Sequence, residues 1–134
     1  MDAPADPLLV FTTLPDEADA RALAARLVEA QLAACVNILA PCVSVYRWQG
    51  AVESAAETPM LIKTTRARYP ALEAALRAAH PYELPELIAV PVACGLTAYL
   101  DWVAASVTPG TLADSGTSAA SIATPADSSV PDVF

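Results

Sequence analysis

The order in which β-prone and helical stretches alternate along the chain restricts its fold more than any other feature. Leu8 to Thr13 is an apolar run that ends in threonines, which predicts a strand buried on both faces. Residues 15–17, Pro-Asp-Glu, then predict a helix start, because proline is tolerated in the first turn and acids favour the positive end of the helix dipole. We expect this helix to end near Ala33.

The next stretch predicts a β-hairpin. A β-prone segment from Cys35 to Tyr46 is interrupted at Pro41, and because proline cannot donate to a sheet ladder, we expect a bulge or an edge there. Residues 48–50, Trp-Gln-Gly, predict the hairpin tip, and Val52 to Thr64 returns as the second strand. Pro59 predicts a second edge or bulge.

A second helix, a loop, a strand and a short third helix complete the order. They are expected at Arg66 to Ala79, at residues 80–86, at Leu87 to Val92, and from a capping Thr97 onward. The order βαββαβ plus a helix predicts a ferredoxin-like α+β (α/β) sandwich, a four-stranded antiparallel sheet with helices on one face. Because nothing in the chain would cover the other face, we expect other subunits to complete it.

Length and composition predict one domain. The 134 residues can form one core but are too few for two ordinary domains, and 55% hydrophobic with 16% charged residues is typical of a compact fold. We place this domain at residues 8–107, between an N-terminal extension (1–7) and a tail (108–134) rich in Ser, Thr, Ala and Pro, both expected to be flexible.

Charge and cysteine content exclude several classes. A net charge of −8 with only seven scattered basic residues argues against nucleic-acid binding. The acidic N-terminus and the lack of an apolar run of ~18 residues predict a cytoplasmic protein without a signal peptide or membrane span. Cys35, Cys42 and Cys94 form no disulfide framework, so the simplest interpretation is small buried apolar residues.

The loop at residues 80–86 carries the densest chemistry. It holds the only histidine, His80, together with Tyr82, Glu83, Glu86 and two prolines that bias their preceding residues toward extended conformations. His80 could bind a divalent cation with Glu83, Glu86 or a carboxylate such as Glu57 of another subunit. It could instead form a hydrogen bond that fixes the loop, and the sequence leaves both interpretations open.

Further side chains could join a site. Cys35 is either a ligand that suits copper or zinc, or a buried core thiol. It should lie on the opposite strand face from Cys42, seven residues on, unless a bulge at Pro41 inverts one of them. Lys63 is expected to pair with Glu57, six residues away on the same face. Four aromatic residues form either a pocket or interface anchors, namely Tyr46, Trp48, Tyr82 and Trp102. The role of interface anchor is favoured for the two tryptophans.

Three stretches occur together in a recognisable order: Ala34-Cys35-Val36-Asn37-Ile38, Ser44-Val45-Tyr46-Arg47-Trp48-Gln49-Gly50 and His80-Pro81-Tyr82-Glu83-Leu84-Pro85-Glu86. With these motifs, the chain from about residue 8 to about residue 107 resembles the CutA family of divalent-cation tolerance proteins. The resemblance implies a small cytoplasmic homotrimer similar to the PII signalling proteins, with hairpin arms (41–59) that reach across to neighbouring subunits. It also implies tolerance of copper and other divalent cations, with no established catalytic reaction.

The chain departs from the family at two possible ligand positions. Some members carry a cysteine where this chain has Thr12, and others have paired histidines at the position of Ala79 and His80. We nevertheless predict a non-catalytic protein that binds copper or zinc and no organic cofactor. The alternative is a PII-like sensor that binds a small molecule at subunit clefts. A hydrolase is disfavoured, because the chain has no Gly-x-Ser-x-Gly motif and only four glycines.

Overall fold

The computed structural model describes residues 6–110, which form five strands and three helices. In chain order these are β1 (Pro7–Leu14), α1 (Glu17–Glu29), β2 (Cys35–Ile38), β3 (Cys42–Trp48), β4 (Ala51–Thr65), α2 (Tyr69–Ala79), β5 (Ile88–Pro91) and α3 (Thr97–Ser106). The predicted N-terminal extension and tail lie largely outside the described residues and stay predictions.

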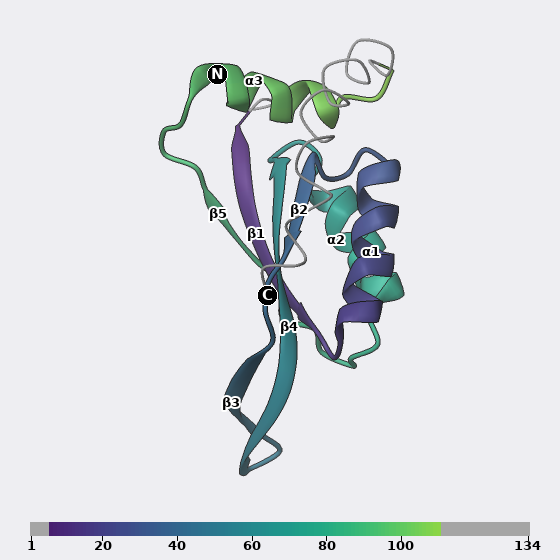
Figure 1. The fold of residues 1–134 in the computed structure, drawn as a ribbon, viewed down its shortest axis with the longest axis vertical. Helices are drawn as coiled ribbons and strands as arrows, with labels where there is room; N and C mark the ends of the chain where they lie inside the picture. The colour runs from purple at the N-terminus through teal and green to yellow at the C-terminus, as the bar shows by residue number, and fades with distance from the viewer. Residues whose placement is uncertain (1–5, 111–134) are drawn as a thin grey trace.

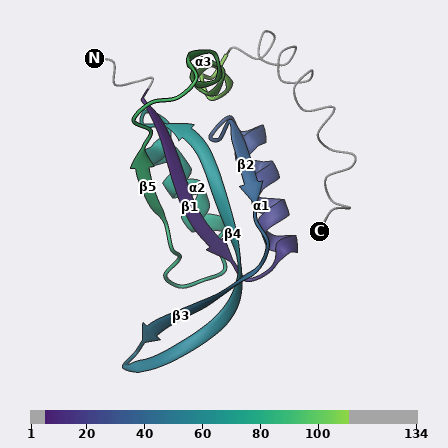
Figure 2. The ribbon, with the colours of Figure 1, turned by 60° about the vertical axis from the view of Figure 1, so that its left-hand side comes forward.

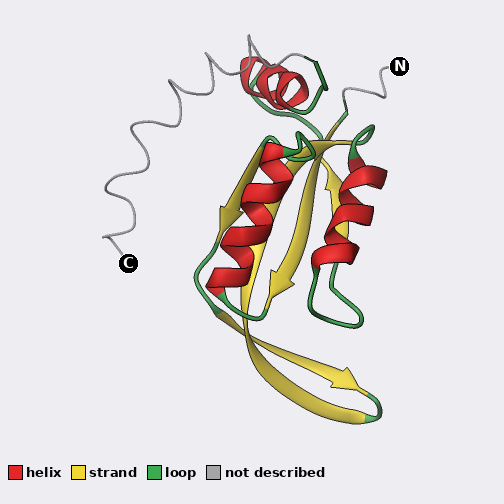
Figure 3. Ribbon diagram, turned by 90° about the vertical axis from the view of Figure 1, so that its right-hand side faces the viewer, coloured by secondary structure: helices red, strands yellow, loops and turns green. Residues whose placement is uncertain are grey.

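The sheet has the predicted ferredoxin-like topology. Its strands lie in the order β2–β4–β1–β5, every neighbouring pair is antiparallel, and β3 pairs only with the first part of β4. The units β1-α1-β2 and β4-α2-β5 are therefore split β-α-β units that interlock. Both α1 and α2 lie on one face of the sheet (Figure 3), which confirms the predicted α+β sandwich.

The hydrophobic core lies between that face and the two helices. Val10 of β1 and Ile62 of β4 are paired across the sheet and fully buried, and Leu27 of α1 and Leu76 of α2 belong to the same cluster. Because successive strand residues point to opposite faces, alternate positions of β1 and β4 fill this core. Each fully buried aliphatic side chain stabilises the fold by about 1.5–3 kcal/mol.

Helix α1 begins and ends differently from the prediction. The N-cap is Asp16, whose side chain accepts a hydrogen bond from the backbone N–H of Asp19 at 2.8 Å, so the proline before it lies outside the helix. The helix ends at Glu29 rather than near Ala33, because Gln31 has a φ of 58°. A residue in this left-handed conformation cannot continue a right-handed helix.

The β3–β4 hairpin projects from the sheet as an arm (Figures 1 and 2). Its tip is the predicted one and contains Gln49 (φ 50°) and Gly50 (φ 85°). Two consecutive positive φ values match the twist of antiparallel strands, and glycine adopts them readily. Three valines of the arm are largely exposed, Val43 (74%), Val45 (69%) and Val52 (67%).

Both prolines of the hairpin region lie where pairing with β2 ends. Pro41 falls between β2 and β3, at the predicted interruption. Pro59 lies within β4 opposite Thr13, and its carbonyl oxygen accepts a hydrogen bond from the N–H of Leu39 at 3.0 Å. The nitrogen of Pro59 has no hydrogen to donate in return, so the β2–β4 ladder stops at this local strand edge without a bulge.

Helix α3 packs at one end of the sheet (Figure 1). Val103 and Val107 are buried with Ala34, and Trp102 packs against them. The predicted cap at Thr97 is wrong, because Thr97 is the first helical residue and no side chain caps the helix. Within residues 6–110, no helix is long and apolar enough to cross a membrane.

Candidate functional site

A cleft of about 800 Å³ lies between the arm and the loop at residues 81–86, which joins α2 to β5. The arm contributes side chains from both of its strands, including Tyr46, Trp48, Glu53 and Glu57, and β1 contributes Thr13. The arm curves below the sheet at the end where this loop lies (Figure 2). Of the predicted site residues, the cleft therefore brings together three aromatic residues and three glutamates.

His80 directly precedes the loop in sequence, and both of its ring nitrogens form hydrogen bonds. The side chain is only 8% exposed, and Nε2 lies 2.7 Å from the carbonyl oxygen of Thr13, which can only accept a hydrogen bond. Nε2 must therefore carry the proton, and Nδ1 accepts a hydrogen bond from the backbone N–H of Tyr82 at 3.1 Å. In this neutral form no ring lone pair is free for a metal ion, so the geometry supports the loop-fixing interpretation.

Tyr82 connects the loop to the arm. Its ring centroid lies 4.9 Å from that of His80, and its hydroxyl donates a hydrogen bond to Glu57. Burial raises the pKa of Tyr82 to about 12, together with the hydrogen bond and negative charge of Glu57 and smaller contributions from Tyr46 and Asp16. The hydroxyl Oγ1 of Thr13 also donates to Oε2 of Glu57 at 3.3 Å, so Glu57 holds the loop, the arm and β1 together.

Four carboxylates line the cleft, and three of them were predicted. Glu83 and Glu86 are exposed on the loop, whose end is held by a hydrogen bond from Oγ1 of Thr12 to the backbone oxygen of Glu86 at 2.7 Å. Glu53 is the residue that sequence reasoning missed. It lies opposite Tyr46 in the arm, and the predicted hairpin register could have placed it beside that aromatic residue.

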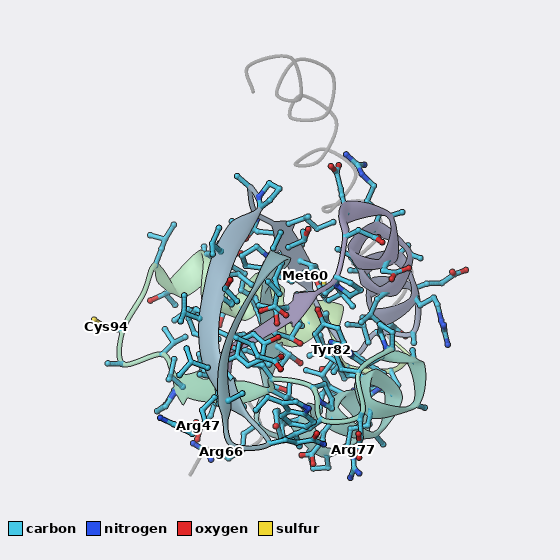
Figure 4. All side chains as sticks on the ribbon, turned by 90° about the horizontal axis from the view of Figure 1, so that it is seen from below. Arg47, Met60, Arg66, Arg77, Tyr82 and Cys94 are labelled. Atoms are coloured by element: carbon cyan, nitrogen blue, oxygen red, sulfur yellow. The ribbon has the colours of Figure 1, made fainter. Side chains whose placement is uncertain are left out.

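Cys35 and Cys42 are too far apart to share a metal ion within one chain. Cys35 pairs with Lys63 and Cys42 with Glu57, so the interruption at Pro41 does place both cysteines on one face. Their partners are six residues apart on β4, which corresponds to ~20 Å along a strand. Cys94 is exposed at the margin of the molecule, away from Tyr82 (Figure 4). Between residues 6 and 110, no three metal-binding side chains are grouped together.

Two predicted cleft residues lie elsewhere. The ammonium group of Lys63 donates to Oδ1 of Asn37 at 2.6 Å, so the predicted pairing with Glu57 is wrong. Lys63 and Glu57 do share a face of β4, but the length of strand between them keeps the side chains apart. Trp102 packs on the cluster around Val103, where its Nε1 has no hydrogen-bond partner among the residues that the structure describes.

The interlocked β-α-β units and the hairpin arm beside a cleft define a ferredoxin-like α+β protein. Residues 8–106 match the family model described as "CutA1 divalent ion tolerance protein", so the chain belongs to this family. The resemblance that the sequence motifs indicated is thereby confirmed.

Individual relatives agree in sequence and in fold. "Divalent-cation tolerance protein CutA" of Thermus thermophilus is 47% identical over 95 residues, which cover 71% of this chain and 92% of that protein. The crystal structure of CutA from Xylella fastidiosa is 45% identical with a TM-score of 0.75, covering 77% of this chain and 99% of that one. The "Periplasmic divalent cation tolerance protein CutA" from Archaeoglobus fulgidus is 35% identical with a TM-score of 0.74, covering 76% and 99%.

Proposed function

We propose that this member of the divalent ion tolerance family is a non-catalytic homotrimer that binds a divalent cation, copper or zinc, at the cleft beside its arm. The observation that carries the proposal is the acidic lining of this cleft, which contains Glu53, Glu57, Glu83 and Glu86 and no lysine or arginine. Carboxylate oxygens bind divalent cations, and a net charge of −8 favours their approach.

The apolar surface of the single chain supports assembly. Beside the exposed valines of the arm, β5 exposes Ile88 (55%) and Val90 (43%) on the sheet face that α1 and α2 leave free. Surfaces of this kind are typical of subunit interfaces. The number of three subunits comes from the family resemblance. A neighbouring subunit could also supply the further ligands that a complete metal site requires, because metal sites usually need three or four.

Calorimetric titration with Cu(II) and Zn(II) tests the proposal. Replacing both Glu53 and Glu83 with glutamine removes two exposed carboxylates of the cleft without touching the hydrogen bonds of Glu57. We expect the double variant to bind either metal at least ~10-fold more weakly, which corresponds to ~1.4 kcal/mol. Glu29→Gln, on the exposed end of α1, is the matched control and should bind normally. Equal affinity in all three proteins would contradict a metal site at the cleft.

Cytoplasmic localisation is a separate part of the proposal. The family resemblance supports it, whereas the relative from Archaeoglobus fulgidus is described as periplasmic. Cell fractionation with antibodies against the full chain tests it. Recovery outside the cytoplasmic fraction would contradict it.

A second candidate function is that of a small-molecule sensor. The observation that favours it is the size of the cleft, since about 800 Å³ is far more than one metal ion occupies and lies within the range of small-molecule sites. A metabolite screen by thermal shift, run beside the metal titration, would separate the two functions. Stabilisation by metals alone would exclude the sensor.

A further inference from the structure

The carboxylates of the cleft have no cationic partner within the part of the chain that the structure describes. The side-chain ion pairs found between residues 6 and 110 join Arg21 to Glu17 and Arg66 to Asp6, away from the cleft. Lys63, the one basic residue predicted to pair with Glu57, instead binds Asn37. Negative charge that is not neutralised by the protein favours a positively charged occupant.

Aromatic rings line the same space as these carboxylates. Tyr46 and Trp48 come from β3 and Tyr82 from the loop, so rings approach the cleft from two separate segments. Tyr46 is 40% exposed, which leaves part of its ring accessible to a ligand. A cation over the face of a tyrosine or tryptophan ring is attracted by the ring quadrupole, most strongly where water is excluded.

The size of the cleft suits an organic cation at these residues. No three metal-ligating side chains converge within the described range, whereas the cleft of about 800 Å³ could enclose a small organic molecule. Carboxylates form bidentate hydrogen bonds with planar nitrogen cations, and aromatic rings stack on these cations.

We propose that the cleft binds a small organic cation with an amidinium, guanidinium or ammonium group, held by Glu53 and Glu83 and stacked against Trp48 and Tyr46. This inference rests on the second candidate function, in which the cleft is a small-molecule site, and it names the chemical class of the ligand. It does not depend on the metal proposal, because the aromatic contacts contribute nothing to metal coordination.

Three probes of nearly equal shape test the charge requirement: benzamidinium (positive), benzamide (neutral) and benzoate (negative). Calorimetry with the full chain should show benzamidinium binding at least ~10-fold more tightly than benzamide, equivalent to ~1.4 kcal/mol, and no binding of benzoate. Glu53→Gln and Glu83→Gln should each weaken benzamidinium binding by ~3-fold or more, while Glu29→Gln should leave it unchanged. Equal binding of the three probes, or none of benzamidinium, would overturn the inference.

The aromatic residues separate this inference from the metal proposal. Trp48→Leu should weaken benzamidinium binding by ~3-fold or more and leave the Cu(II) and Zn(II) titrations unchanged. Tyr46→Leu provides a second test if the tryptophan variant misfolds. Benzamidinium binding that is unaffected by both aromatic variants would overturn the proposed stacking. Metal binding without benzamidinium binding would defeat only this inference, and the reverse would defeat only the metal site.

Discussion

The imidazole of His80 donates from Nε2 to the carbonyl oxygen of Thr13 at 2.7 Å, and so joins the end of α2 to the end of β1 across 67 positions of sequence. Its Nδ1 meanwhile receives the N–H of Tyr82. We therefore predict that His80→Ala lowers the free energy of unfolding by ~1–3 kcal/mol, because buried hydrogen-bonding groups lose their partner.

Chemical denaturation of the variant checks this prediction. Arg77→Ala, on the exposed last turn of α2, is the control and should change stability little. Metal affinity should stay within ~2-fold of the original, since neither ring nitrogen is free to coordinate. A loss of metal affinity of ~10-fold or more without a loss of stability would show that His80 is a ligand rather than a structural hydrogen-bonding residue.

Tyr82 should be the tyrosine that ionises at the highest pH. Its pKa is raised to about 12 by burial first and then by Glu57, from the ordinary 10.0 of the unfolded chain. Glu57→Gln should lower the pKa of Tyr82, because it removes the negative charge beside the phenol. Ultraviolet phenolate titration checks this, with Tyr82→Phe identifying the transition. A transition that Tyr82→Phe leaves in place would contradict the assignment.

The raised pKa of Tyr82 also predicts that the folded protein loses stability at alkaline pH. Between about pH 10 and 12 the unfolded state has released the Tyr82 proton while the folded state retains it. The contribution of Tyr82 to the free energy of unfolding is therefore fully present below pH 10 and is lost as pH rises through the pKa of the folded state. Urea denaturation across this range should show a steeper fall for the original protein than for Tyr82→Phe. Equal slopes would count against a raised pKa.

The sequence predicted much of the fold, because local patterns determine strand alternation and turn chemistry. The strand β1, the Gln49-Gly50 tip and the interruption at Pro41 all follow from neighbouring residues. The predicted burial of β1 on both faces is wrong for the single chain, because Leu9 and Phe11 lie on the sheet face that the helices leave free and are only partly buried. The end of α1 did not, since a glutamine gives no sign that Gln31 adopts a positive φ.

The candidate site was harder to predict from the sequence than the fold, because it depends on how the arm curves toward a loop that is distant in sequence. Glu83 and Glu86 were visible as loop carboxylates, but only the folded arm brings Glu53 and Glu57 to the same cleft. The Lys63–Glu57 ion pair was predicted from the sequence but does not form in the structure. A shared strand face was correct there, and the distance along β4 prevented contact.

The hairpin tip should depend on the glycine at its second position. At Gly50 an added Cβ would meet no atom within 4 Å, so only the backbone conformation at φ 85° opposes a side chain. Gly50→Ala should reduce stability by ~1–2 kcal/mol, whereas Gly50→Asn should reduce it less, because asparagine tolerates this conformation. Thermal unfolding of the two variants checks the order. Equal melting temperatures would contradict the strained-turn account.

Assembly should depend on the exposed valines of the arm. Light scattering of the full chain at micromolar concentration should report a trimer, and the double variant Val43→Glu/Val45→Glu should report smaller species, because it places charge on apolar surface. Ala25→Glu on the exposed face of α1 is the control and should remain trimeric. A stable monomer of the original protein would contradict the proposed assembly.

Anomalous diffraction from a crystal grown with copper tests the central claim most directly, because it locates the bound cation. The proposal predicts a copper peak in the cleft, at coordination distance from carboxylate oxygens among Glu53, Glu57, Glu83 and Glu86, with His80 still bound to Thr13. A peak at Cys35 or Cys94 with none in the cleft, or no peak at all, would contradict it.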